Sequence, residues 1–114
     1  MTERMLIYDV GAHRGEDTSF YLAKGFTVVA VEASPQLCDE MRERFHDYID
    51  AGRLRLINIA IADYNGTIDF YVDSAVSVWS TVNYEWVLRN ADKSWIKTNT
   101  RDRIRTITVE CAPL

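Results

Sequence analysis

The fold is decided by the stretch Leu6-Ile7-Tyr8-Asp9-Val10-Gly11-Ala12-His13-Arg14-Gly15 and by a second stretch, Val28-Val29-Ala30-Val31-Glu32. In each stretch a run of apolar residues leads to an acid, and the first run continues into a loop that contains two glycines. An α/β sheet binds a nucleoside with this layout, because the glycine loop lets the backbone approach the ligand and the second acid accepts hydrogen bonds from the ribose. The two stretches therefore predict a ligand that contains a nucleoside.

The length and composition indicate a single globular domain. The chain has 114 residues, of which 47% are hydrophobic and 26% charged, and these proportions are ordinary for a domain with its own core. No apolar run is long enough to span a membrane and no signal-peptide pattern is present, so we expect a cytoplasmic protein with no membrane partner. The net charge of −4 argues against a nucleic-acid partner. Cys38 and Cys111 have no metal-binding or redox spacing, so we expect free thiols and no metal site.

The first half of the chain has the pattern of alternating strands and helices. Three apolar segments are typical of buried parallel strands: residues 6–10, 27–31 and 54–59. Helices are expected over residues 16–25 and 34–52, the second beginning with the N-cap and proline pair Ser34-Pro35. Right-handed crossovers would place the strands in one parallel sheet. We therefore predict an α/β fold, a Rossmann-like three-layer α/β/α domain in which residues 1–63 form the cofactor-binding core.

The second half of the chain has a different pattern, and we assign residues 64–114 to an antiparallel extension with a variable insertion. The turn signal at residues 63–66 separates the apolar positions of residues 57–61 from the alternating segment 68–72, which predicts an antiparallel pair across the turn. Residues 105–111 alternate again and are expected to form another strand.

The insertion is polar and is expected to hold one short helix, over residues 84–90. Residues 89–105 contain six basic and two acidic side chains. This segment is either a solvated insertion or a patch that attracts an anionic substrate such as a sugar phosphate, and its spacing does not select between the two.

The glycine loop departs from the dinucleotide fingerprint. Its pattern is Asp9-x-Gly11-x-x-x-Gly15, and His13 stands where the G-x-G-x-x-G motif needs glycine. A pyrophosphate would lack its usual cradle, whereas an acid at the strand end suits the ammonium group of S-adenosylmethionine. We therefore expect S-adenosylmethionine as cofactor, with Asp9 orienting it. Gly11 and Gly15 either admit the ligand or simply form a tight turn, and His13 is a further binding candidate in the loop.

Polar residues also follow the second and third strands. Glu32 is expected to accept both ribose hydroxyls, and the alternative is an exposed acid at a strand end. Near the third strand, Ala60 would pack on the adenine while Asn58 or Asp63 bonds its edge, although Asp63 suits a turn equally well. No spacing predicts a nucleophile, a general base or a metal ligand, so the catalytic residues are unknown.

Taken together, these segments resemble the FkbM family of S-adenosylmethionine-dependent methyltransferases. The resemblance is carried by residues 7–18, 30–35, 56–63, 66–72 and 77–81. It implies a Rossmann-like methyltransferase fold in which the glycine loop, Glu32 and Ala33 hold the cofactor, with Asp63 near the adenine. Members typically O-methylate hydroxyls on sugars or natural products, which implies a small-molecule or glycan acceptor that attacks the sulfonium methyl in line.

The family pattern continues with further sheet beyond the strand at residues 105–111. We therefore expect this chain to represent the cofactor-binding half, with an open edge along residues 6–10 that a second copy or a partner would cover. Two alternatives belong to other classes: a non-catalytic S-adenosylmethionine-binding fragment and a protein-interaction module. A nicotinamide-dependent dehydrogenase is disfavoured by His13.

Overall fold

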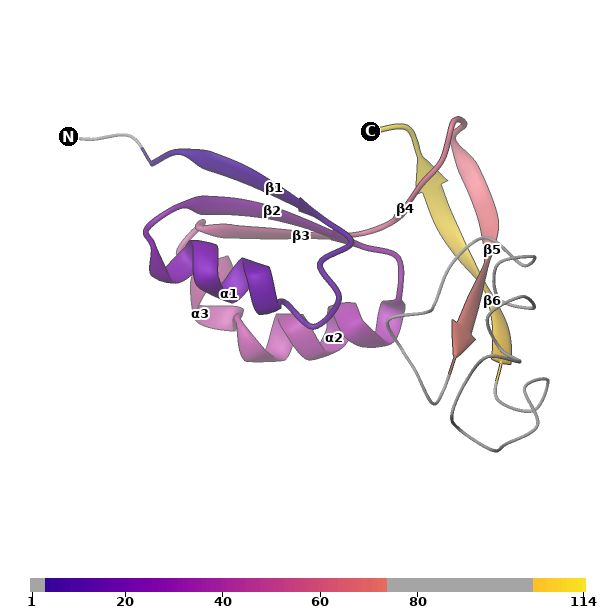
Figure 1. Cartoon of the computed structure of the whole chain (residues 1–114), viewed down its shortest axis with the longest axis horizontal. Coiled ribbons are helices and arrows are strands. Elements are labelled where there is room, and N and C mark those ends of the chain that lie inside the picture. The colour runs from indigo at the N-terminus through magenta and orange to yellow at the C-terminus, as the bar shows by residue number, and fades with distance from the viewer. Residues whose placement is uncertain (1–3, 74–103) are drawn as a thin grey trace, which may run out of the picture.

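The computed structural model of the chain describes residues 4–73 and 104–114. Their elements, in chain order, are β1 (Leu6–Val10), α1 (Glu16–Ala23), β2 (Thr27–Glu32), α2 (Pro35–Arg44), α3 (His46–Asp50), β3 (Leu54–Asn58), β4 (Ala60–Ile61), β5 (Gly66–Asp73) and β6 (Ile104–Ala112). The strands form two three-stranded sheets, and Figure 1 shows the second sheet standing beyond the end of the first. The expected helix over residues 84–90 and nearly all of the basic segment lie outside the described residues.

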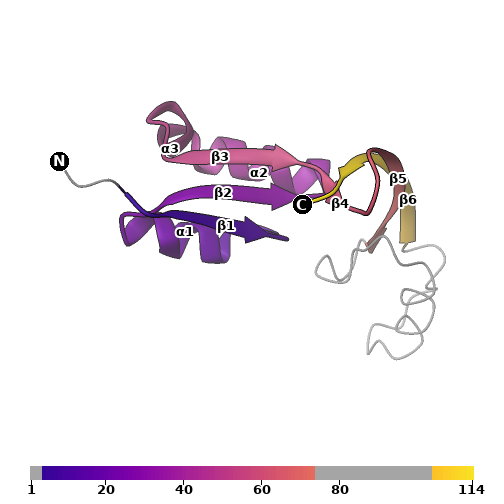
Figure 2. The ribbon, with the colours of Figure 1, turned by 90° about the horizontal axis from the view of Figure 1, so that it is seen from above.

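The first sheet is parallel, with strand order β1-β2-β3. Figure 1 shows α1, α2 and α3 together on one face of this sheet, and Figure 2 shows the three strands running in the same direction. Consecutive right-handed crossovers place their helices on the same face. The predicted α/β fold with a parallel sheet is therefore confirmed, and its helical layer lies on a single side in the part described.

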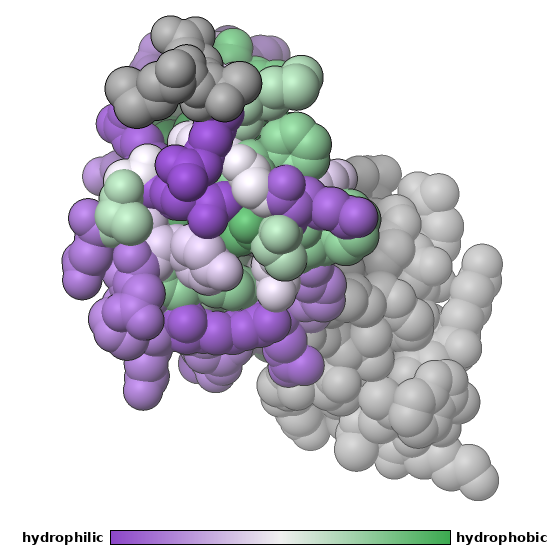
Figure 3. Space-filling view, turned by 90° about the vertical axis from the view of Figure 1, so that its left-hand side faces the viewer, coloured by the Kyte–Doolittle hydropathy of each residue, from purple (hydrophilic) through white to green (hydrophobic). Residues whose placement is uncertain are grey.

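The expectation that β1 is buried is wrong. Leu6, Tyr8 and Val10 are 50%, 64% and 48% exposed, and only Asp9 of this strand is buried. The reason is positional: in the described part of the chain β1 is an edge strand, and alternate side chains point to the face that none of the three described helices covers. Figure 3 shows apolar atoms in green toward the top of the molecule, on the side away from the helices, while hydrophilic atoms in purple cover much of the helical side.

The core lies between the first sheet and its helices. Its buried members are Ala12, Leu22, Val28, Ala30, Met41, Phe45 and Leu54. They come from the glycine loop, from β2 and β3, from α1 and α2, and from Phe45 at the junction of α2 and α3. The packing that joins the sheet to its helices therefore also holds the glycine loop. The glycine loop is therefore anchored to the core through Ala12.

The single helix expected over residues 34–52 is divided in two. Ser34 caps α2 as predicted, since its side chain accepts a hydrogen bond from the Leu37 amide, and Pro35 occupies the first turn. The helix ends at Arg44 because Phe45 leaves the helical region, with φ −108° and ψ 20°, and α3 begins at the next residue. The Phe45 side chain is buried in the core, so tertiary packing overrides the continuous helical pattern.

The second sheet corrects the expected antiparallel pair. The strand predicted over residues 54–59 ends at Asn58, and the short β4 that follows pairs in parallel with β6. Strand β5 pairs with β6 in antiparallel register, Ile68 opposite Val109, so the sheet order is β4-β6-β5 and the two segments flanking the turn are not neighbours. The predicted strand at residues 105–111 is confirmed as β6.

The second sheet has its own apolar cluster, which explains this pairing. Ala60, Phe70, Val109 and Cys111 are buried together, with Ala33 packed against them. Inserting β6 between β4 and β5 brings apolar side chains from three strands onto one face, which a two-stranded hairpin could not achieve. Figure 2 shows β5 and β6 beyond the arrowheads of β2 and β3, where the carboxyl ends of the parallel strands meet.

Candidate cofactor site

The loop after β1 is joined to the end of β2 by backbone hydrogen bonds. The amides of Gly11 and Ala12 both donate to the carbonyl oxygen of Val31, at 2.8 and 3.0 Å. Gly11 has φ 75°, and a Cβ built on it would meet no atom of residues 4–73 and 104–114 within 4 Å. Backbone conformation explains the glycine, and the open space beside it leaves room for a ligand to approach the backbone.

His13 is the sole non-glycine residue with positive φ in residues 4–73 and 104–114, at φ 57°. Such a conformation costs about 1–3 kcal/mol and persists when surrounding contacts enforce it. Here the His13 amide donates to Glu32 Oε1 at 2.8 Å, and a hydrogen bond to a charged group contributes about 1.5–3 kcal/mol. The imidazole Nδ1 lies 3.4 Å from Glu16 Oε1. The carboxylate of Glu32 therefore offsets the strain in the loop.

Glu32 lies at the centre of the candidate site and is only 8% exposed. Its second oxygen, Oε2, accepts a 2.8 Å hydrogen bond from the amide of Ser34, the N-cap of α2. One carboxylate thus joins the glycine loop to the start of α2. A carboxylate offers about four acceptor positions on its two oxygens, so these two bonds leave acceptor capacity for ribose hydroxyls.

Gly15 has a different role from Gly11. It is the N-cap of α1 with φ 86°, and a Cβ on it would lie 2.6 Å from Cε2 of Phe45. That distance is well inside van der Waals contact, so a larger residue would displace a core side chain. Of the two interpretations open from the sequence, the tight turn and its packing account for Gly15 without a ligand.

Asp9 is buried and faces the helical side of the sheet. Its Oδ2 accepts a 2.6 Å hydrogen bond from the hydroxyl of Thr18, a residue of α1 with no exposed surface. Thr18 was not among the site residues predicted from the sequence. The available signal was its place: it is a hydroxyl residue in the first turn of the helix that follows the strand containing Asp9. The pair connects β1 to α1, and the predicted contact of Asp9 with an ammonium group stays a prediction.

The residues after β3 divide into two groups. Asn58 lies beside Glu32 in the sheet register, and its Nδ2 donates to the carbonyl oxygens of Glu32 and Ala33, at 2.9 and 3.0 Å. Ala60 is buried in the apolar cluster of the second sheet, and Asp63 is exposed in the turn before β5. The structure therefore brings Asn58 and Ala33 to the glutamate, whereas Ala60 has a protein environment that already accounts for it.

A buried thiol lies directly behind this site. Cys38 Sγ donates to the carbonyl oxygen of Glu32 at 3.3 Å. Burial, together with the negative charge of Glu32, raises the pKa of the Cys38 thiol to about 11. The thiol stays protonated at neutral pH, so it acts as a hydrogen-bond donor rather than as a nucleophile.

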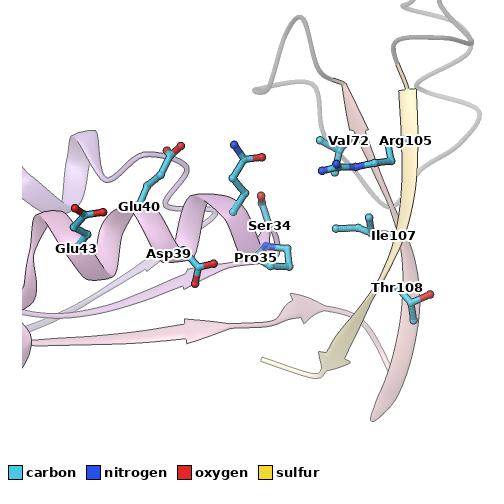
Figure 4. A pocket seen from close by; sticks show the side chains of 10 residues that line it. Ser34, Pro35, Asp39, Glu40, Glu43, Val72, Arg105, Ile107 and Thr108 are labelled. Atoms are coloured by element: carbon cyan, nitrogen blue, oxygen red, sulfur yellow. The ribbon is translucent and has the colours of Figure 1, made fainter.

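A separate cavity of about 590 Å³ lies between α2 and the second sheet. Figure 4 shows acidic Asp39, Glu40 and Glu43 on α2, while Val72, Arg105 and Ile107 face them from β5 and β6. Ser34 lines this cavity with its own atoms, and it is the point at which the cavity borders the glutamate site. None of the cofactor-binding residues predicted from the sequence lines this cavity, but Arg105, the last residue of the basic segment, does.

Comparison with known proteins identifies the family. The family model described as the methyltransferase FkbM domain matches residues 9–114, which include the whole glycine loop and every strand after β1. The chain belongs to the FkbM methyltransferase domain family. The resemblance expected from the sequence is thereby confirmed, and so is the Rossmann-like methyltransferase fold class.

Among solved structures, the FkbM chain is similar to YjhP from Escherichia coli, with a TM-score of 0.43 and 19% identity. The similarity covers 56% of this chain and 28% of YjhP, so it spans under a third of that protein. No curated protein matches the chain. Within residues 4–73 and 104–114, no helix is long and apolar enough to cross a membrane, and no three His, Cys, Asp or Glu residues cluster as a metal site would require.

Proposed function

We propose that this chain is the cofactor-binding part of an S-adenosylmethionine-dependent methyltransferase that methylates a hydroxyl group of a sugar or another small molecule. Family membership supports methyl transfer in general. The observation that carries the proposal is the buried carboxylate of Glu32 beside the open backbone of Gly11, at the carboxyl ends of β1 and β2. Ligands of open parallel sheets bind at that edge.

The residues present fit an adenosyl group. Glu32 is fixed by two backbone amides and retains acceptor positions for ribose hydroxyls. The space beside Gly11 admits a ligand to the backbone. Asp9 adds a second buried carboxyl group, on the strand next to the one that ends in Glu32. S-adenosylmethionine would supply a methyl group on a positively charged sulfur. The chain's part is to hold the cofactor and orient it toward an acceptor.

The proposal is tested by calorimetric titration of the purified chain with S-adenosylhomocysteine, with NADH as the matched nucleotide control. Saturable binding of S-adenosylhomocysteine alone is expected. A folded chain that binds neither compound, or that binds NADH equally well, would contradict the cofactor assignment. Methyl transfer to a panel of sugar and small-molecule hydroxyls would then separate an active enzyme from a non-catalytic binding fragment.

A second candidate function is protein interaction through β1. The observation in its favour is that β1, which has a single neighbour in the described residues, exposes Leu6, Tyr8 and Val10, and that Met5 just before it is exposed as well. An unpaired apolar strand edge is a template for pairing with another chain. We propose a second copy of this chain as that partner, and a test at the level of the whole molecule is given in the Discussion.

A further inference from the structure

We propose that the second sheet carries a binding groove for the ring of a neutral hexose, separate from the proposed cofactor site. The groove has a volume of about 410 Å³, which is within the range of about 300–1,000 Å³ typical of small-ligand pockets. None of its lining residues belongs to the cofactor site, so the inference goes beyond the proposed function and does not rest on it. The lining residues are Tyr64, Thr67, Ile68, Asp69, Tyr71 and Thr108.

The alternation of side chains along β5 places its polar residues on one face. Ile68 packs with the buried Phe70 in the apolar cluster of the second sheet. Successive side chains of a strand point to opposite faces, so Thr67, Asp69 and Tyr71 lie on the other face. The face of β5 away from the apolar cluster therefore carries a hydroxyl, a carboxyl group and a phenol ring in one row.

Strand β6 adds a further hydroxyl beside this row. Thr108 lies directly opposite Asp69 in the antiparallel register, and Cβ atoms of directly opposite residues are about 4.5–5.5 Å apart. Both residues are exposed, and no described charged side chain forms an ion pair with Asp69. The carboxylate and the hydroxyl are therefore neighbours whose hydrogen-bonding capacity is open to a ligand.

The ring of Tyr64, in the turn before β5, is held over the start of that strand. Its hydroxyl donates to the carbonyl oxygen of Thr67 at 3.2 Å, and a Cβ built on Gly66 would lie 3.6 Å from the ring atom Cε2. The backbone carbonyl oxygen of Tyr64 accepts a bond from Cys111 Sγ at 3.7 Å. Tyr64 is still 45% exposed, so it presents aromatic surface to the groove in a fixed position.

The ring of a hexose matches this combination of groups. A hexose has apolar C–H surface on the faces of its ring and hydroxyls around the rim, and aromatic side chains offer apolar surface of similar extent. A carboxylate accepts strong hydrogen bonds from hydroxyls, and a threonine hydroxyl both donates and accepts. None of the described lining residues is cationic, so an anionic ligand would lack a counter-charge. The groove therefore fits a neutral, ring-shaped ligand that is rich in hydroxyls.

The test is a titration of the isotope-labelled full chain with the methyl glycosides of glucose, galactose and mannose, followed through amide chemical shifts. Cyclohexanol is the control ligand, because it has a ring of the same size and a single hydroxyl. Saturable shifts at Thr67, Asp69 and Thr108 are expected with at least one glycoside, at a dissociation constant of about 1–10 mM. Cyclohexanol should cause no saturable shift in that range.

Variants of the lining residues test the two kinds of contact. Asp69→Ala should weaken binding by about tenfold or more, because the sugar hydroxyls lose a charged acceptor. The matched control is Glu110→Ala, since Glu110 is an exposed acid opposite Thr67 on β6 that does not line the groove, and it should bind as the wild type does. Tyr64→Ala should weaken binding by a similar factor, whereas Tyr64→Phe keeps the ring and should stay within about threefold of the wild type.

A folded wild-type chain that gives no saturable shift with any of the three glycosides would overturn the proposal. An equal response to cyclohexanol, or wild-type affinity in Asp69→Ala, would overturn it as well, and Asp69→Ala decides the matter if Tyr64→Ala does not fold. Shifts confined to Ser34 and the glycine loop would place the sugar at the cofactor site and contradict the groove. Titration with S-adenosylhomocysteine tests the proposed function separately, since a chain that binds it but no glycoside would contradict the groove alone.

Discussion

The two loop glycines of the proposed site have different surroundings. Both have positive φ, yet a side chain at Gly15 would collide with Phe45, whereas one at Gly11 would point into open space. The motif spacing is the same for a packing glycine and for a ligand-facing one. The surroundings distinguish them.

Substituting the glycines should therefore give opposite results. Gly15→Ala is expected to lower the free energy of unfolding by about 2–4 kcal/mol, from overpacking against Phe45 and backbone strain. Gly11→Ala should cost only about 1 kcal/mol of strain but weaken S-adenosylhomocysteine binding by about tenfold or more, because the new methyl group occupies the ligand's approach. Urea unfolding and calorimetry measure the two effects.

Gly25→Ala is the matched control, since Gly25 also has positive φ and a Cβ on it would meet no described atom within 4 Å, but it lies past the C-terminal end of α1, away from the loop. It should lose stability as Gly11→Ala does and bind the ligand normally. Equal affinities of these two variants would show that the ligand does not approach the backbone at Gly11.

Cys38 makes a pH-dependent contribution to stability. Its pKa is raised from 9.0 to about 11 by burial and by Glu32. The unfolded chain gives up this proton first as the pH rises, so the contribution is complete below pH 9 and is lost toward pH 11. The free energy of unfolding should fall in that window by on the order of 2 kcal/mol from this group.

Urea unfolding between those pH values, with and without Cys38→Ala, checks the effect. The variant is less stable throughout because a buried side chain is removed, but its stability should decline less steeply with pH. Parallel declines in the two proteins would mean that Cys38 does not contribute.

At the scale of elements, the first sheet and its helices are joined by buried polar bonds as well as by apolar packing. The Asp9–Thr18 bond connects β1 to α1, and Glu32 connects the glycine loop to α2. Buried polar groups are costly unless they are paired. These bonds therefore select one placement of each helix against its strand.

Thr18→Val tests the first of these connections, because it keeps the shape of the side chain and removes the hydroxyl. The buried carboxylate of Asp9 would lose its partner, and the free energy of unfolding should fall by about 1–3 kcal/mol. Thr67→Val, at an exposed position of β5, should change it by less than about 0.5 kcal/mol. Similar losses in the two variants would show that the Asp9–Thr18 bond contributes little.

At the scale of the whole molecule, the first sheet has helices on one face and apolar side chains on the other, along an edge strand that lacks a second neighbour in the part described. Sheet edges and apolar faces of this kind promote association. The proposed cofactor site lies at the end of the same strands, so pairing along β1 would leave Glu32 accessible.

Sedimentation velocity over a range of chain concentrations should show reversible self-association. Tyr8→Lys places a charge on the exposed face of β1 and should shift the chain toward monomer by about tenfold or more in dissociation constant. Phe20→Lys, on the 57% exposed Phe20 of α1, serves as control and should leave association unchanged. A wild-type chain that stays monomeric would rule out the second copy as the partner of β1.

The sequence by itself determined the parallel strand–helix–strand order, the capped start of α2, the family, and the place of Glu32 after the second strand. Each depends on a local signal: apolar periodicity, an N-cap followed by proline, or an acid at the end of a strand. These signals come from residues that are close together in the sequence, so they can be recognised without the structure. The position of Glu32 followed from the pattern, although its two backbone partners did not.

Only the tertiary structure decided which strands pair and which backbone amides the Glu32 carboxylate binds. Strand β6 lies between β4 and β5 because apolar residues far apart in sequence share one cluster. The helix breaks at Phe45, and the Phe45 ring packs so closely on residue 15 that only glycine fits there. The exposure of Leu6, Tyr8 and Val10 on β1 depends on which face of the sheet the helices cover. These outcomes depend on contacts between residues distant in the chain, which local propensity and spacing do not encode.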